Sequence, residues 1–407
     1  MRRLDWLDAL RGLAAITVVL FHLSPQVIGD EAHLAVMRQI DLGKYAVLLF
    51  FLVSGYVIPM SLERHGSLRR FWIGRLCRIY PAYLVTIGLF ALLAAAGLLH
   101  WQASLRAETG AGVLAHITMM PDLVGVRGVV RVFWTLSYEM VFYLVVAGLF
   151  AARAHRHSAW YAAGLGLVAG LGGAYLPESS TGNSWSDRRL LAAVLVLVVG
   201  LTLIWQVKGL AAGAIGIAFV LLPALNGHAG PGSTVRSSAQ GLLLLAVMFA
   251  GTVIYRWQHR QIGDVPAVLA LVVVTGALIG DQGLGTALAV VATFLLAYVF
   301  RKRAMPQGLT WLGRISYSLY LLHVVVLFMI PRLVPDLGTQ GLPTRVAAGV
   351  AYVIIVLTLA AIGYRIVEQP GQALGRRLAA RIDASHLPHT QSAAPRTTRG
   401  DNARESV

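Results

Sequence analysis

Apolar stretches long enough to cross a lipid bilayer recur along this 407-residue chain. A membrane-spanning helix needs about 17 to 25 predominantly apolar residues. The mean hydropathy is +0.69 and only 13% of the residues are charged, which excludes a soluble globular core. The sequence therefore predicts an all-α, polytopic transmembrane helical bundle with ten to twelve spans. The twelve candidate spans lie near residues 9–27, 43–62, 79–99, 132–152, 158–176, 189–206, 209–226, 239–255, 264–280, 284–300, 312–334 and 343–366.

Lysine and arginine are unevenly distributed between the loops that join these spans. The formal net charge is +16, and most positive residues fall in loops on one side, such as 63–78 and 301–303. Loops on the other side, such as 177–188, hold few. Because cytoplasmic loops are enriched in lysine and arginine, we expect a multi-pass protein of the inner (plasma) membrane with both termini in the cytoplasm. The expected partner of this charge is the lipid bilayer and not nucleic acid.

Composition divides the chain into two parts. Residues 1–370 form the predicted transmembrane domain, and we expect no cleavable signal, because the first apolar run is long enough to span and no small-residue cleavage site precedes Pro25. Residues 371–407 form a predicted cytoplasmic region, in which leucines and arginines at helical spacing over 371–383 indicate an amphipathic surface helix. The polar tail beyond it is expected to be disordered. Cys77 is the single cysteine, so we expect no internal disulfide, and no metal site is predicted.

The first span carries two ionisable residues, Arg11 and His22. Their spacing corresponds to three helical turns plus about 20°, so both side chains share one face and lie about 16 Å apart along the axis. An arginine inside the bilayer costs at least about 2.5 kcal/mol, which favours a polar cavity along this face. The alternative is that Arg11 marks the cytoplasmic interface and His22 is a hydrogen-bonded core residue.

A second basic pair, Arg75 and Arg78, stands at i, i+3 where the third span begins. Two guanidinium groups on one helical face can bind phosphate oxygens bidentately. The alternative is ordinary flanking of a span by positive charge on the cytoplasmic side.

The fourth span contains Glu139, at about the same depth from the outer surface as His22. A carboxylate in lipid needs a partner, so we expect the two side chains to pair. Trp134 and Tyr138 are candidate substrate-binding residues, or else belong to the aromatic belt at the membrane surface.

The eleventh span holds Tyr320 and His323, which share a face at i, i+3 and are further candidates for substrate binding. A histidine that hydrogen-bonds between helices is the alternative for His323. Glu368, at the inner end of the last span, either pairs with a loop arginine or contacts a ligand.

These segments together resemble the acyltransferase 3 family of integral-membrane O-acyltransferases. The resemblance covers residues 3–145 and 308–370 closely, and 155–300 only by hydrophobic character. The family is typically drawn with about ten spans, fewer than the twelve counted here. Some members add a C-terminal SGNH esterase-like domain, for which the 37 residues after Pro370 are too few, so we expect a stand-alone member. The matching segments are, in order, RGLAAITVVLFH, FFLVSGYVI, FWIGRLCRIYPAY, WTLSYEMVFY, LGRISYSLYLLH and VEQP.

The resemblance implies transfer of an acyl group, usually acetyl, from acyl-CoA to a hydroxyl of a carbohydrate or glycosylated acceptor. It makes acyl-CoA (acetyl-CoA) a co-substrate, with no tightly bound cofactor. Arg11 and His22 match the family's essential Arg-x10-His pair, and Arg75 and Arg78 match the Arg-x2-Arg pair of the donor side.

We therefore expect the donor phosphates to meet Arg75 and Arg78 and the pantetheine arm to pass Arg11. Neutral His22 would then act as general base on the acceptor hydroxyl, with its imidazole oriented by Glu139.

Two other classes of protein fit parts of this pattern. A proton-coupled secondary transporter of a small polar solute also combines many spans with buried arginine, glutamate and histidine. Against it, the two halves of the chain do not match, and the charged residues concentrate in the first four and last two spans. A membrane scaffold protein would not need a buried His22. The acceptor stays open between surface polysaccharide, lipopolysaccharide, peptidoglycan and a small glycosylated natural product.

Overall fold

The computed structural model describes most of the chain, and the regular elements in this part are helices. The described residues are 4–101, 105–106, 109–126, 128–176, 185–205, 213–216, 218, 235 and 237–384. The longer helices are α1 (Asp5–Ile28), α2 (Asp30–Gln39), α3 (Leu42–His65), α4 (Leu68–Ala95), α8 (Trp134–Ala151), α9 (Ser158–Leu171), α10 (Trp185–Trp205), α12 (Ser238–Gln258), α13 (Asp264–Gln282), α14 (Leu284–Val299), α15 (Gln307–Leu327), α17 (Leu342–Gly363) and α18 (Gln369–Ala384). The shorter ones are α6 (Thr109–Ile117), α7 (Pro121–Val124), α16 (Ile330–Leu333), the 3₁₀ turns η1 (Arg131–Phe133), η2 (Gly173–Tyr175) and η3 (Leu337–Thr339), and the π turn η4 (Tyr364–Glu368).

The prediction of an all-α polytopic bundle is confirmed. Within the described residues, eight helices are long and apolar enough to cross a membrane, and α9 and α14 are shorter apolar helices. The candidate span near 189–206 corresponds to α10, whereas the one near 209–226 lies largely outside the described residues. The count of twelve spans stays a prediction.

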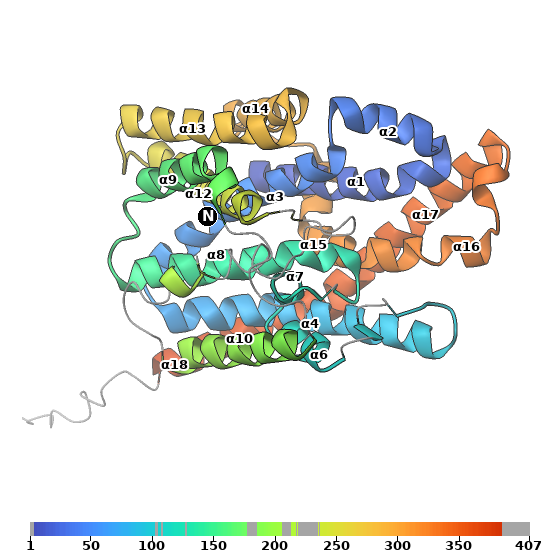
Figure 1. Ribbon diagram of the computed structural model, residues 1–407, viewed down its shortest axis with the longest axis horizontal. Helices are drawn as coiled ribbons and strands as arrows, with labels where there is room; N and C mark the ends of the chain where they lie inside the picture. The colour runs from blue at the N-terminus through green and yellow to red at the C-terminus, as the bar shows by residue number, and fades with distance from the viewer. Residues whose placement is uncertain are drawn as a thin grey trace, which may run out of the picture.

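Helices α8 and α12 form the centre of the bundle. Nearly all their residues are buried, as expected of helices that are apolar on every side. The helices α13 and α17 lie at the periphery and expose large apolar side chains such as Leu269 and Ile354. Apolar surface of this extent fits contact with lipid. Most of the long helices, among them α1, α4, α8 and α13, run along a common direction (Figure 1).

One close helix contact that positions the site joins α1 to α15. A Cβ on Gly12 would lie 2.1 Å from the carbonyl oxygen of Leu309, and a Cβ on Gly313 would lie 1.9 Å from that of Asp8. Only glycine allows the two backbones to approach this closely. Small residues are the usual means of close packing between helices in a membrane, where lipid removes the hydrophobic driving force.

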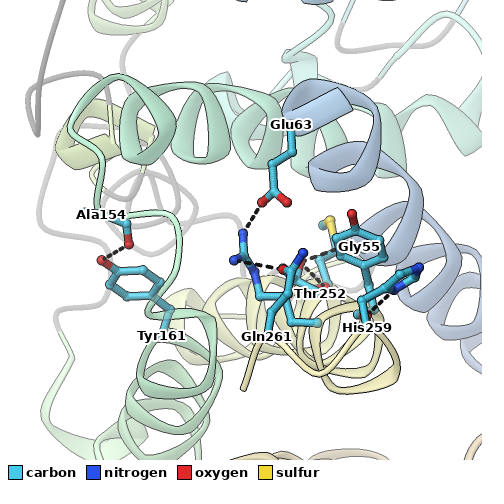
Figure 2. A network of polar contacts seen from close by, with 10 residues as sticks. Gly55, Glu63, Ala154, Tyr161, Thr252, His259 and Gln261 are labelled. Atoms are coloured by element: carbon cyan, nitrogen blue, oxygen red, sulfur yellow. Dashed lines mark hydrogen bonds and ion pairs between the residues drawn. The ribbon is translucent and has the colours of Figure 1, made fainter. Parts of the chain in front are cut away.

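A second close contact joins α3 to the central helix α12. A Cβ on Gly55 would lie 1.7 Å from the carbonyl oxygen of Met248. The hydroxyl of Thr252 donates to the carbonyl of Gly55 at 2.8 Å, and Glu63 forms an ion pair with Arg256 near the end of both helices (Figure 2). These contacts fix α3 against the core.

The two ends of the bundle differ. The elements α2 and α16 lie at one end, on the right of Figure 1, and α18 lies toward the opposite end. The chain passes from α17 through the π turn into α18 without a break. The predicted amphipathic segment 371–383 falls within α18, which packs on α4, where a Cβ on Gly371 would lie 2.5 Å from the carbonyl oxygen of Cys77. The predicted disordered tail lies outside the described residues.

The substitution Gly313→Ala should separate α1 from α15, because its methyl group would collide with backbone atoms. We expect a loss of about 1–3 kcal/mol in the free energy of unfolding, the usual cost of overpacking. Thermal unfolding of the purified protein in detergent measures it. The matched control is Gly276→Ala in α13, where no heavy atom outside the helix lies within 4 Å of the added Cβ. Equal stability of the two variants would contradict the role of this contact.

Candidate active site

A cavity opens between five helices, α1, α3, α4, α8 and α15. Its empty volume is about 810 Å³, including the part that is open to solvent. Most of its apolar lining side chains belong to α3, and the polar lining residues come from all five helices. The polar lining residues are Arg11, Ser54, Arg75, Arg78, Thr135, Glu139, Tyr143, Ser316, Tyr317 and Tyr320.

Three arginines, Arg11, Arg75 and Arg78, line this one cavity. Both Arg75 and Arg78 lie on α4, so the prediction that they share a helical face is confirmed. The guanidinium group of Arg75 lies 5.6 Å from the ring centroid of Tyr143, within the range of a cation–π contact. Because Glu139 is the single carboxylate among the described lining residues, positive charge predominates and the cavity suits an anionic group.

Glu139 lies among the arginines and is not paired with His22. Its carboxylate accepts hydrogen bonds from the hydroxyl groups of Tyr143 at 2.7 Å and Ser54 at 3.2 Å, and it interacts electrostatically with Arg11. The expected pairing with His22 is therefore wrong. Glu139 on α8 faces α3 and α4 and shares its cavity with Arg11, about three helical turns along α1 from His22, so the equal depth expected from counting residues was wrong as well.

His22 instead meets His323 of α15. The Nδ1 atom of His22 lies 3.2 Å from Nε2 of His323 and 3.0 Å from the carbonyl oxygen of Val18. The two imidazole centroids are 5.1 Å apart. The ring of Tyr320, which lines the cavity, lies 5.8 Å from that of His323. The histidine pair thus adjoins the arginine-lined cavity through Tyr320.

The other sequence-predicted site residues divide into two groups. Tyr320 lines the cavity, and its hydroxyl donates to the carbonyl of Val132 at 2.9 Å. Trp134 and Tyr138 are buried and are not among the lining residues of this cavity. The ring of Trp134 faces the ammonium group of Lys44 at 4.9 Å.

Sequence reasoning missed Ser54, Tyr143 and Tyr317 as cavity residues. Tyr143 follows Glu139 by one helical turn and donates to it, so the i, i+4 spacing was an available signal. Tyr317 donates to the carbonyl of Ile79 at 3.0 Å and thereby ties α15 to α4. No local pattern marks such a contact between distant segments.

Glu368 binds α15 through hydrogen bonds to Ser318. It is 1% exposed, and its carboxylate accepts from the backbone N–H of Ser318 at 2.8 Å and from the Ser318 hydroxyl. It is also an electrostatic neighbour of Arg78 and Arg11. The π turn that contains Glu368 turns this carboxylate into the bundle.

A second hollow, here called the α4–α18 groove, adjoins the cavity. The two spaces share Arg75 and Arg78. The groove is basic, and its empty volume is about 1060 Å³. A charged ligand in either hollow can therefore contact the shared arginines. The groove is lined by Ser61, His65, Arg70, Phe71, Gly74, Arg75, Arg78, Gln372, Gly375, Arg376, Ala379 and Ala380.

The substitution Ser318→Ala should destabilise the protein, because it removes one donor from a buried carboxylate. We expect a cost of about 1–3 kcal/mol, measured by thermal unfolding in detergent. Thr358→Val on α17 is the matched control, since its hydroxyl bonds only to the carbonyl of Ile354 and is exposed. A Ser318 variant as stable as the control would show that the backbone N–H alone satisfies Glu368.

Comparison with known proteins gives a match over nearly the whole chain. The model of a family described as "Acyltransferase domain" matches residues 4–365. The acyltransferase MdmB of Streptomyces mycarofaciens is 32% identical over 154 residues, which are 35% of this chain and 38% of that protein. YrhL of Bacillus subtilis (strain 168), named provisionally as a peptidoglycan O-acetyltransferase, is 24% identical over 404 residues, 92% of this chain and 56% of its own length.

The chain thus covers 38% of MdmB and 56% of YrhL, which is less than two thirds of either relative's own length. No solved structure matches the chain. The family match includes every helix that contributes to the cavity, together with both histidines. This chain belongs to the acyltransferase 3 family.

Proposed function

We propose that this protein is a membrane O-acyltransferase that moves an acyl group, usually acetyl, from acyl-CoA to a hydroxyl of a carbohydrate or glycosylated acceptor. The observation that carries the proposal is the arginine-lined cavity, which shares Arg75 and Arg78 with an adjoining basic groove. The names of the relatives support it, since one is an acyltransferase and the other is named for O-acetylation of peptidoglycan.

The donor would enter from the α4–α18 groove. Coenzyme A carries several phosphates, and arginine binds phosphate oxygens bidentately. With the loop 63–78 and both termini in the cytoplasm, the groove faces the compartment that holds acyl-CoA. Arg11 lies about 16 Å from His22 along α1, three helical turns away. We therefore assign Arg11 to the donor's path and not to the reacting carbonyl.

The chemistry needs a base for the acceptor hydroxyl. Neutral His22 would take the hydroxyl proton at Nε2 while the oxygen attacks the thioester carbonyl carbon. The C–S bond then breaks, and the imidazolium returns the proton to the departing thiolate of coenzyme A. The products are the acyl ester and free coenzyme A, so no redox partner is required.

The substitutions Arg75→Ala and Arg78→Ala should each weaken acetyl-CoA binding about ten- to a hundredfold, since each removes a charge-assisted contact of about 1.5–3 kcal/mol. Lysine at either position should recover only part of the loss if the contact is bidentate. Equilibrium binding of acetyl-CoA to the purified protein measures the effect. Arg314→Ala is the control, because this exposed arginine of α15 lies outside both hollows. Unchanged affinity in both alanine variants would indicate that Arg75 and Arg78 only help to set the orientation of the protein in the membrane.

The substitution His22→Gln should lower acyl transfer about 10²–10⁴-fold, because glutamine can hydrogen-bond but cannot accept a proton at neutral pH. The assay follows coenzyme A release from acetyl-CoA by protein in liposomes, with cell-envelope glycans or glycosylated small molecules as acceptors. Normal expression and normal acetyl-CoA binding of the variant are the controls. Near-normal transfer by His22→Gln would refute the base assignment. Wild-type protein that binds no acetyl-CoA and instead couples proton flow to uptake of a polar solute would favour a transporter.

A further inference from the structure

We propose that His323 is a positioning residue, which holds the ring of His22 with its proton on Nδ1 and leaves Nε2 free to act as the base. The role in catalysis rests on the proposed function, whereas the tautomer itself rests on the geometry alone. It replaces the direct substrate contact that the sequence suggested for His323.

The hydrogen bonds of His323 fix its own tautomer. Its Nδ1 atom lies 2.7 Å from the carbonyl oxygen of Tyr320 and 3.2 Å from that of Leu319. Carbonyl oxygens only accept, so Nδ1 carries the proton. A neutral imidazole then has its lone pair on Nε2. The side chain is fully buried, which favours the neutral form over an imidazolium.

The lone pair of His323 in turn determines the tautomer of His22. Nε2 of His323 lies 3.2 Å from Nδ1 of His22, and two lone pairs at that distance would repel each other. Nδ1 of His22 therefore carries a proton and donates it. The carbonyl of Val18, at 3.0 Å, accepts from the same atom. That carbonyl also accepts the helical N–H of His22, since α1 is continuous here. The Val18 carbonyl is therefore shared between the backbone and the ring of His22, whereas Nε2 of His323 accepts from the ring.

This arrangement leaves Nε2 of His22 with a lone pair. Within the described part of the chain, no hydrogen bond occupies that atom. When Nε2 takes a proton from a hydroxyl group, Nδ1–H becomes a charged donor, and its bond to His323 strengthens. An acceptor at this point therefore stabilises the imidazolium that the reaction forms, without itself taking the proton.

The backbone around His323 holds it in place independently of its ring. The hydroxyl of Tyr352 on α17 donates to the carbonyl oxygen of His323 at 2.9 Å. This contact supplies a matched control, because Tyr352→Phe removes a hydrogen bond from the same buried neighbourhood and leaves both imidazole rings untouched.

The experiment compares His323→Phe, His323→Gln and Tyr352→Phe. Phenylalanine fills the ring's space without an acceptor, whereas the glutamine side-chain oxygen can reach the position of Nε2 and accept from His22. We expect His323→Phe to lower kcat about ten- to a hundredfold, the value of a hydrogen bond to a charged group, with the KM for acetyl-CoA unchanged. His323→Gln and Tyr352→Phe should keep kcat close to that of the wild type.

Two kinetic results would overturn the proposal. One is a His323→Phe variant with wild-type kcat, and the other is a His323→Gln variant as impaired as His323→Phe, which would mean that the imidazole itself is needed.

Because His323→Phe can fail to fold, the ¹⁵N spectrum of histidine-labelled wild-type protein provides a second measurement. The His22 signals, identified by their loss in His22→Gln, should show a protonated Nδ1 and an unprotonated Nε2. The opposite tautomer would refute the proposal. Absence of acyl transfer by wild-type protein would instead refute the proposed function, and the spectrum would still decide the tautomer.

Discussion

The contact between the backbones of α1 and α15 is the constraint on which the rest of the site depends. With Gly12 and Gly313 at the crossing, the helices approach until a single added methyl group would overlap backbone atoms. Further along the same pair, this approach brings the rings of His22 and His323 within hydrogen-bond distance. A larger residue at the crossing would widen the whole interface, because helices are stiff and a displacement at one turn carries to the next.

The electrostatic balance of the interior is the second constraint. Arginine in a membrane interior is costly unless it faces a counter-charge or a polar cavity. Arg11, Arg75 and Arg78 share one cavity, where Glu139 and the nearby Glu368 supply negative charge. Both carboxylates are themselves held by hydroxyl or backbone donors. The remaining positive charge gives a physical reason for an anionic ligand at this place.

Local properties of the sequence were enough to predict the helices and the faces that carry charge. The length of each apolar run predicts a membrane span. The helical period of 3.6 residues per turn predicts the direction of each side chain around the helix axis. Arg75 and Arg78 were placed on one face in this way, and Arg11 and His22 on one continuous helix. The order of the motifs also identified the family, which the match over residues 4–365 confirms.

Only the tertiary structure decided which faces meet. Counting residues placed Glu139 level with His22, whereas the structure places it beside Arg11, about three helical turns from His22 along α1. Both the depth of a helix and its rotation about its axis depend on packing against non-local neighbours. Glu139 turns toward the arginines through Tyr143 and Ser54, and His22 turns toward His323, 301 positions away in the chain. The sequence by itself determined which helices form and which side chains lie on each face of a helix. The partners were fixed by close approach at a few glycines, whose effect appears only when two distant segments pack together.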